Sequence, residues 1–166
     1  MEYKMKEMEG ARILVVDDEE GIRKSLKAVL EEEGCVVDTA ENGQEAIAKS
    51  KTGSYNLALV DIRLPDMDGV ELLTSMSGTA PKMVRIIVTG YPSLDNAIQA
   101  VNRGVDGYIV KPFTMEQLLN KIKEHLQKQQ EAEKYTEDKV KKYVESRTKE
   151  MDTKLRGASL DERKAS

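Results

Sequence analysis

Two short apolar runs in this chain lead directly into acidic residues. Residues 13–16 (ILVV) are followed by Asp17 and Asp18, and residues 57–60 (LALV) are followed by Asp61. A short run that is apolar throughout is typical of a parallel strand that is buried on both faces. Residues at the carboxyl ends of such strands line the ligand crevice of an open α/β sheet. We therefore expect three carboxylates to converge, and their mutual repulsion favours a cation bound among them.

Strand and helix patterns alternate along the chain with short connections. Strands are predicted at residues 13–16, 36–39, 57–60, 85–88 and 107–110, with a helix after each. Ser93 is expected to cap the fourth helix, and Thr114 with Gln117 forms a capping box at the start of the fifth. Strict alternation of this kind predicts an α/β fold, a doubly wound five-stranded parallel sheet with helices on both faces.

Charge divides the chain into unequal parts. The chain is 39% apolar and 34% charged, which indicates a segment with little core of its own. Residues 1–126 carry 15 Lys and Arg against 21 Asp and Glu, whereas residues 127–166 carry 11 against 9. We expect an N-terminal extension at 1–10, one domain at 11–127, and a charged helical extension or linker at 128–166 whose end is disordered.

The last forty residues are expected to continue the fifth helix. Acidic residues precede basic ones by four positions, as in Glu137 and Lys141, and this order supports an exposed helix. Gly157 is the predicted stop. The apolar stripe is thin and consists of Val140, Val144, Met151 and Leu155. Two interpretations remain open, a solvated helical extension and a weak coiled coil that pairs two protomers.

Several classes of protein are disfavoured by composition. An acidic domain lacks the basic face that neutralises nucleic-acid phosphates, so we expect no direct nucleic-acid binding. No apolar stretch reaches membrane-spanning length, and the single Cys35 rules out a disulfide framework. These features favour a soluble cytoplasmic protein with no membrane partner, in which Cys35 is a small buried apolar residue.

Two further strand ends carry polar groups, Thr89 after the fourth strand and Lys111 after the fifth. Phosphoryl transfer to a carboxylate would use this whole set. A divalent cation would bridge carboxylates and the incoming phosphoryl group, while an ammonium and a hydroxyl would bind its remaining oxygens. An aspartate is a competent nucleophile for phosphorus.

Four segments together resemble the receiver domains of two-component response regulators. These are VDDEE at 16–20, DIRLPDMDG at 61–69, VTG at 88–90 and KPF at 111–113, within a match over residues 12–127. The resemblance implies a flavodoxin-like sheet of order 2-1-3-4-5, similar to that of the stand-alone chemotaxis regulators. It also implies a signalling protein that catalyses only its own phosphorylation and dephosphorylation, and is not otherwise an enzyme.

The same resemblance implies the site residues. Asp61 is the phosphoacceptor, and a Mg²⁺ ion, with Mn²⁺ as an alternative, is bound by Asp17, Asp18, Asp61 and the main-chain carbonyl of Arg63. Thr89 and Tyr108 match the family's switch pair. Lys111 matches its phosphate-binding lysine, and the bond between Lys111 and Pro112 is expected to be cis. The side chain of Arg63 is expected to face the site and to affect phosphate loss in a direction that the sequence does not give.

The implied partners are a sensor histidine kinase or phosphotransfer protein and a downstream protein. A homodimer through the fourth-helix and fifth-helix face, or through the C-terminal helix, is a further expectation. The cognate kinase, the stimulus and the output stay open, as does the question of whether the chain continues into an output domain.

Three other functions share parts of this pattern. A flavin or nucleotide binder needs a Gly-rich or hydroxyl-rich loop after the first strand, where this chain has acidic residues. An aspartate-nucleophile phosphatase uses similar groups, but its nucleophile ends the first strand, whereas here the acidic pair comes first. A phosphorylation-independent adaptor would not need every chemical position to be filled. We therefore favour the receiver.

Overall fold

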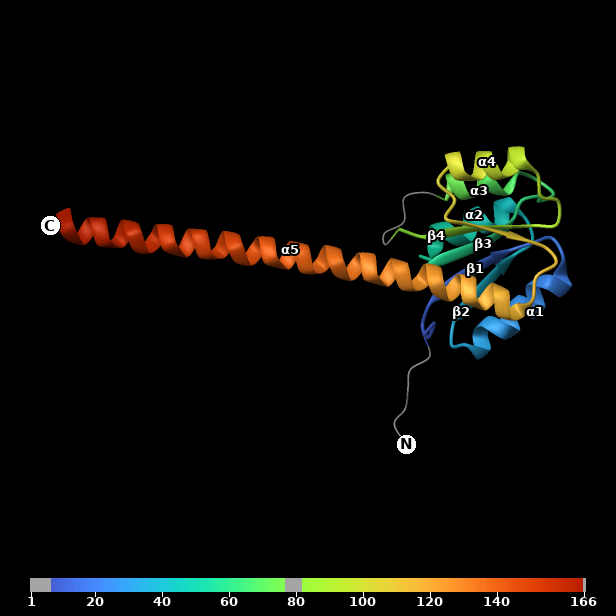
Figure 1. Ribbon diagram of the computed structural model, residues 1–166, viewed down its shortest axis with the longest axis horizontal. Helices are drawn as coiled ribbons and strands as arrows, with labels where there is room; N and C mark the ends of the chain where they lie inside the picture. Colours follow the sequence, from blue (N-terminus) through green and yellow to red (C-terminus); the bar gives the residue numbers. More distant parts are fainter. Residues whose placement is uncertain (1–6, 77–81, 166) are drawn as a thin grey trace, which may run out of the picture. The chain divides into compact units, whose positions relative to one another are not determined.

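The computed structural model describes residues 7–76 and 82–165, in which strands and helices alternate (Figure 1). The elements are β1 Arg12–Val16, α1 Glu20–Glu32, β2 Val36–Ala40, α2 Gly43–Thr52, β3 Leu57–Asp61, α3 Gly69–Ser75, β4 Val84–Thr89, α4 Leu94–Asn102, β5 Gly107–Val110 and α5 Met115–Ala165. Each predicted strand is present. Asp61 and Thr89 are the last residues of β3 and β4, rather than the first residues after them.

The five strands form one parallel sheet in the order β2-β1-β3-β4-β5, which confirms the predicted fold. Val16 pairs with Val60, Asp61 with Val88, and Thr89 with Val110. The carboxyl ends of four neighbouring strands therefore lie at one edge of the sheet. This register brings together the polar residues that end or follow those strands.

The helices cover the two faces of the sheet (Figure 1). On one face, α1 and the first turns of α5 bury Leu26, Leu30, Leu118, Ile122 and Leu126 against the strands. On the other, α2, α3 and α4 bury residues that include Ala46, Val70, Leu72, Leu73, Met76 and Ala100. Since both faces are covered, each central strand must be apolar throughout, as the sequence pattern indicated.

The predicted caps are present at the helix starts. The side chain of Ser93 accepts a hydrogen bond from the Asn96 amide at 3.1 Å. Thr114 and Gln117 form the capping box, since the side chain of each accepts from the main-chain amide of the other, at 3.1 and 3.0 Å. Asp68 caps α3 through the Val70 amide at 2.7 Å. These bonds satisfy amides that have no partner within the helix.

Three details of the fold were not predicted from the sequence. Met8, assigned to a terminal extension, is 1% exposed and packs in the core; residues 1–6 of that extension lie outside the described residues. The apolar residues Leu94, Ile98 and Val101 of α4 are exposed, and Ala100 makes the buried contact. The predicted stop at Gly157 is wrong, because α5 continues to Ala165. One glycine costs a helix only about 1 kcal/mol.

Contacts divide the chain into two units, Met1–Gln129 and Gln130–Ser166. The second unit is the C-terminal part of α5. Its apolar side chains Val140, Tyr143, Val144, Met151 and Leu155 are all exposed. Ion pairs such as Arg156 with Asp152, at 3.4 Å, lie along its surface. None of the described helices combines the length and apolar character needed to cross a membrane.

Candidate functional site

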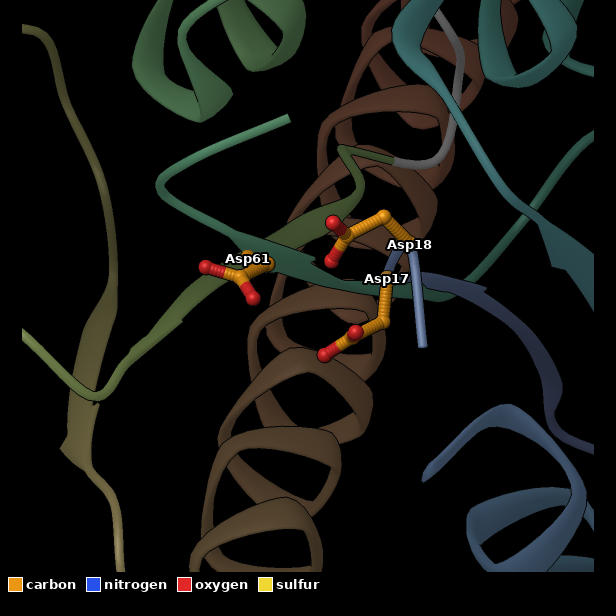
Figure 2. A group of neighbouring side chains, drawn as sticks. All are labelled: Asp17, Asp18 and Asp61. Atoms are coloured by element: carbon orange, nitrogen blue, oxygen red, sulfur yellow. The ribbon is translucent and has the colours of Figure 1, made fainter. Parts of the chain in front are cut away.

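Three carboxylates converge at the carboxyl edge of the sheet (Figure 2). Asp17 and Asp18 follow β1 directly, and Asp61 ends β3. Each offers an oxygen, and these oxygens lie within 4.8 Å of one another. Asp17 is buried, Asp61 is half-buried and Asp18 is exposed, so the cluster opens to solvent on one side. The structure thus brings together the three acids that the sequence pattern selected.

Lys111 bridges two of these acids from the loop after β5. Its Nζ atom lies 3.0 Å from Asp17 Oδ2 and 3.1 Å from Asp61 Oδ2. The peptide bond from Lys111 to Pro112 is cis. One ammonium group therefore partly neutralises an acidic site that would otherwise be strongly repulsive.

The environment of the site shifts the ionisation of both partners. Burial raises the pKa of the Asp61 carboxyl, and the hydrogen bonds from the Arg63 amide and from Lys111 offset this effect only in part. For Lys111, burial acts to lower the pKa, but the hydrogen bonds and charges of Asp17 and then Asp61 outweigh it and raise the pKa. Lys111 is therefore a protonated ammonium at neutral pH. It remains available to bind an anion.

The donor set fits a hard divalent cation. Mg²⁺ and Mn²⁺ prefer oxygen ligands, and Mg²⁺ is commonly bound through one or two carboxylates with water and phosphate completing its shell. Asp17 Oδ1 accepts a hydrogen bond from the Glu19 amide at 2.9 Å, and this bond fixes the position of the Asp17 carboxylate. The Arg63 amide donates to Asp61 Oδ1 at 3.1 Å, so the backbone of Arg63 lies beside the same carboxylate.

Thr89 and Tyr108 occupy neighbouring strands. Thr89 is 1% exposed, and its hydroxyl oxygen accepts a hydrogen bond from the Tyr91 amide at 3.0 Å. Tyr108 lies opposite Ile87 in the sheet, and its ring packs on the core that α2, α3 and α4 cover. The Tyr108 hydroxyl is buried and has no hydrogen-bond partner among the described residues. Such a group is costly to bury, which favours alternative positions of the ring.

Several other contacts surround the site. The Arg63 guanidinium, which was expected to face the site, lies over the Tyr91 ring. Arg23 donates from Nη1 to the main-chain carbonyl of Asp17 at 2.7 Å. Asp66, in the loop between β3 and α3, accepts hydrogen bonds from amides at the start of α2. His125 is a half-buried helix residue and lies beside Gly107, at the opposite end of β5 from Lys111.

Comparison with known proteins gives consistent matches over the first unit. Residues 13–123 match the family model described as the response regulator receiver domain. The transcriptional regulatory protein ResD of Bacillus subtilis strain 168 is 39% identical over 112 residues, which cover 68% of this chain and 46% of ResD. SrrA of Staphylococcus aureus strain NCTC 8325, also a transcriptional regulatory protein, is 36% identical over 118 residues, 71% of this chain and 48% of SrrA. The chain thus spans about half the length of these relatives.

Solved structures match nearly along their whole length. A CheY-like response regulator receiver domain protein from Methanospirillum hungatei JF-1 is 46% identical with a TM-score of 0.71, and the match covers 74% of this chain and 98% of that one. The beryllofluoride-activated NtrC4 receiver domain dimer is 40% identical with a TM-score of 0.66, over 71% of this chain and 98% of that one.

Proposed function

The chain belongs to the response regulator receiver domain family, and from this we propose that Asp61 accepts a phosphoryl group from a histidine kinase or phosphotransfer protein in a Mg²⁺-dependent reaction. The observation that carries the proposal is the contact of Lys111 with both Asp17 and Asp61 beside the exposed Asp18. That arrangement supplies a nucleophile, cation ligands and an anion-binding ammonium at one strand edge. The protein's contribution is positioning and charge neutralisation.

In the proposed transfer, a carboxylate oxygen of Asp61 forms a bond to phosphorus while the bond from phosphorus to the donor imidazole nitrogen breaks. The electron pair of the broken bond stays on that nitrogen. Bound Mg²⁺, held by Asp17, Asp18, Asp61 and the Arg63 carbonyl, would neutralise charge on the phosphoryl oxygens. The Lys111 ammonium exchanges its carboxylate partners for a phosphoryl oxygen. No other covalent step is needed from the protein.

Thr89 and Tyr108 are proposed as the switch that reports phosphorylation. The Thr89 hydroxyl would donate to a phosphoryl oxygen, which draws the loop after β4 toward the site. The Tyr108 hydroxyl has no hydrogen-bond partner in the part of the chain that the structure describes, which supports a ring with more than one position. Phosphorylation would shift the populations of two pre-existing conformations. The output surface is formed by α4, β5 and the start of α5, where Leu94 and Val101 are 77% and 73% exposed.

A hollow beside Lys111 supports docking of the phosphodonor protein. It has a volume of about 560 Å³ and lies between the start of α1 and the connection from β5 to α5. Ile22, Leu26, Phe113 and Met115 supply apolar lining, and Glu19 and Lys111 supply charge. A partner helix seated there would bring a histidine close to Asp61. We propose a cytoplasmic location for this protein because the proposed phosphodonor is a histidine kinase or phosphotransfer protein.

The domain division and the output are proposed on similar grounds. We assign the receiver to residues 11–127 and the extension or linker to residues 128–166. The curated relatives are named as transcriptional regulators, and this chain matches about half of each. Residues 1–126 have a net charge of −6, which argues against DNA binding by the receiver itself. We therefore propose that the signal passes on through protein contacts.

A homodimer is proposed through one of two exposed apolar surfaces. The first is the face formed by α4 and the start of α5, where Leu94, Ile98 and Val101 of α4 are exposed, and the second is the stripe on the C-terminal part of α5. Measuring the mass in solution with and without beryllofluoride distinguishes them, for the whole chain and for one that ends at Gln129. If the chain that ends at Gln129 still dimerises, the dimer interface is the first surface. If that chain is monomeric, the interface is the C-terminal part of α5.

Phosphorylation is tested directly with acetyl phosphate and intact-mass measurement. The wild type should gain one phosphoryl group with Mg²⁺ and none with EDTA, and Asp61→Asn should gain none. Beryllofluoride with Mg²⁺ should also shift amide resonances of α4 and β5. A phosphoryl group found on Asp61→Asn, or steady turnover of a phosphomonoester that survives in that variant, would contradict the proposal and favour an aspartate-nucleophile phosphatase.

A further inference from the structure

The turn that starts α2, residues 41–44, carries no residue of the proposed site. It is hydrogen-bonded, however, to the loop between β3 and α3, which contains Arg63. Asp66, in the loop between β3 and α3, accepts hydrogen bonds from the amides of Gly43 and Gln44 at 2.8 and 2.9 Å, one on each carboxylate oxygen. These amides are among the first in α2, where no intrahelical partner exists. A carboxylate is favoured there by the helix dipole as well.

The residue after Asp66 packs on the same turn. A Cβ atom added at Gly43 would lie 2.4 Å from both Cγ and Sδ of Met67, so the Met67 side chain fills the space that any larger residue at position 43 would need. Gly43 is buried as a result. Two consecutive residues of the β3–α3 loop therefore fasten it to α2, one by hydrogen bonds and the other by packing.

Arg23 of α1 and the helix cap at Asn42 hold the turn at residues 41–44 in place. Arg23, whose side chain is 15% exposed, donates to the Asp17 carbonyl and lies 3.9 Å from a carboxylate oxygen of Glu41. The Asn42 side chain accepts from the Glu45 amide at 2.8 Å, and the Glu45 side chain accepts from the Glu41 amide at 3.2 Å. These two bonds fix the backbone to which Asp66 binds.

The loop that Asp66 holds contains a main-chain group of the proposed cation site. The Arg63 amide is already hydrogen-bonded to the Asp61 side chain. The backbones of Arg63 and Asp68 also form an isolated antiparallel β-bridge across the loop. A side-chain ligand can adjust by rotation, but a main-chain carbonyl lies where the loop backbone puts it. Fixing the loop therefore fixes the Arg63 carbonyl.

We propose that Asp66 is a positioning residue of the acidic site: by fastening residues 63–68 to the start of α2, it holds the Arg63 backbone where a divalent cation can use its carbonyl. This inference rests on the proposed function, because it assumes that Mg²⁺ binds at Asp17, Asp18 and Asp61. Asp66 itself does not contact the cation. Groups that orient metal ligands commonly change affinity by a factor of ten or more when they are removed.

The test compares Mg²⁺ affinity in variants of the full chain, measured by calorimetry and by amide chemical shifts. Asp66→Ala should bind Mg²⁺ about tenfold more weakly than the wild type. Asp66→Asn, which keeps one acceptor oxygen, should be intermediate. The matched control is Asp106→Ala, because Asp106 also accepts from a main-chain amide, that of Arg85 at 2.8 Å, but at the opposite end of the sheet. That control should leave Mg²⁺ affinity unchanged.

Each remaining outcome decides the matter. A folded Asp66→Ala with wild-type Mg²⁺ affinity overturns the inference, as does an equal loss of affinity in Asp106→Ala, which would indicate general destabilisation. If Asp66→Ala does not fold, Gly43→Ala displaces Met67 and should weaken Mg²⁺ binding instead; unchanged affinity there also overturns it. If the wild type binds no Mg²⁺, the proposed function is overturned as well. If the wild type binds Mg²⁺ and is phosphorylated while Asp66→Ala keeps its Mg²⁺ affinity, only the role of Asp66 is overturned and the proposed function stands.

Discussion

The guanidinium of Arg63 lies over the ring of Tyr91, 4.3 Å from the ring centre. Arg63 is two residues past Asp61, and Tyr91 is two residues past Thr89. The contact therefore joins the two loops that flank the carboxyl ends of β3 and β4. Cation–π contacts of this kind contribute about 0.5–1 kcal/mol at exposed sites.

This contact predicts the effect of Arg63 on phosphate loss. Arg63→Ala and Tyr91→Ala should each shorten the lifetime of the phosphorylated protein about two- to fivefold, because the loops separate more easily and water reaches the phosphoryl group. Since the two residues share one contact, the double variant should be no faster than either single variant. Tyr91→Phe keeps the ring and is the control. Lifetimes are measured from the decay of the phosphorylated mass, and multiplied effects in the double variant would contradict the idea.

The acidic cluster predicts a stability that depends on Mg²⁺. At a concentration one hundred times its Kd, Mg²⁺ should add about 2.7 kcal/mol to the free energy of unfolding of the wild type. Asp18→Asn removes a carboxylate from the repulsive group, so it should raise stability in EDTA while losing the Mg²⁺-dependent gain. Thermal unfolding in EDTA and in a Mg²⁺ series measures both effects. A full Mg²⁺-dependent gain in Asp18→Asn would show that Asp18 is not a ligand.

The convergence of Asp17, Asp18, Asp61 and Lys111 was predictable because it depends on a general rule. Apolar strands in a parallel sheet put their carboxyl ends at one edge, so knowing where each strand ends is enough to place the polar residues together. Receiver-domain membership was also correctly identified from four short segments, as the match over residues 13–123 confirms. The caps at Ser93 and Thr114 were also predictable, because a helix cap involves only residues that are neighbours in the sequence.

The contacts of Asp66 and Tyr91 were not predictable, because each joins loops that are distant in the chain. Asp66 binds amides more than twenty residues away, at 22 and 23 positions, and its sequence neighbours indicate only a turn. Which apolar residues of α4 are exposed was not predictable, for a related reason. Helical spacing shows that Leu94, Ile98 and Val101 share a face, but it does not show whether that face meets the sheet.

Gly69 allows α3 to begin directly against the strand end that carries Asp61. A Cβ atom at this position would lie 2.3 Å from the Asp61 carbonyl oxygen and 3.0 Å from Ile62 Cα, both main-chain atoms that cannot rotate away. Gly69→Ala should therefore lower the free energy of unfolding by about 1–3 kcal/mol and slow phosphorylation of Asp61.

The control for Gly69 is Gly21→Ala in α1, where a Cβ atom would meet no atom of residues 7–76 or 82–165 within 4 Å. That substitution should be neutral or should stabilise by about 0.5–1 kcal/mol, because alanine favours the helix. Urea unfolding measures both variants. Equal stability of the two would mean that the close approach at Gly69 is not a constraint on α3.

Cys35 lies just before β2 and is 6% exposed, with its Sγ atom 3.5 Å from the Met8 carbonyl oxygen. Burial, with a smaller contribution from the charge of Glu33, raises the pKa of the Cys35 thiol from an ordinary 9.0 to about 11. The thiolate is the reactive form, so alkylation of the native protein should be slow.

A raised thiol pKa in the folded state also sets the direction of a pH effect on stability. Below pH 9 the thiol is protonated in both states, but between about pH 9 and pH 11 only the unfolded chain loses the proton. The contribution of Cys35 should therefore fall across this window, by at most about 1.4 kcal/mol per pH unit. Because lysines and tyrosines titrate here too, the quantity to follow is the difference in unfolding free energy between wild type and Cys35→Ala. That difference should be constant below pH 8 and should shift in favour of Cys35→Ala above pH 9; a constant difference throughout would mean that the thiolate is accommodated in the folded protein.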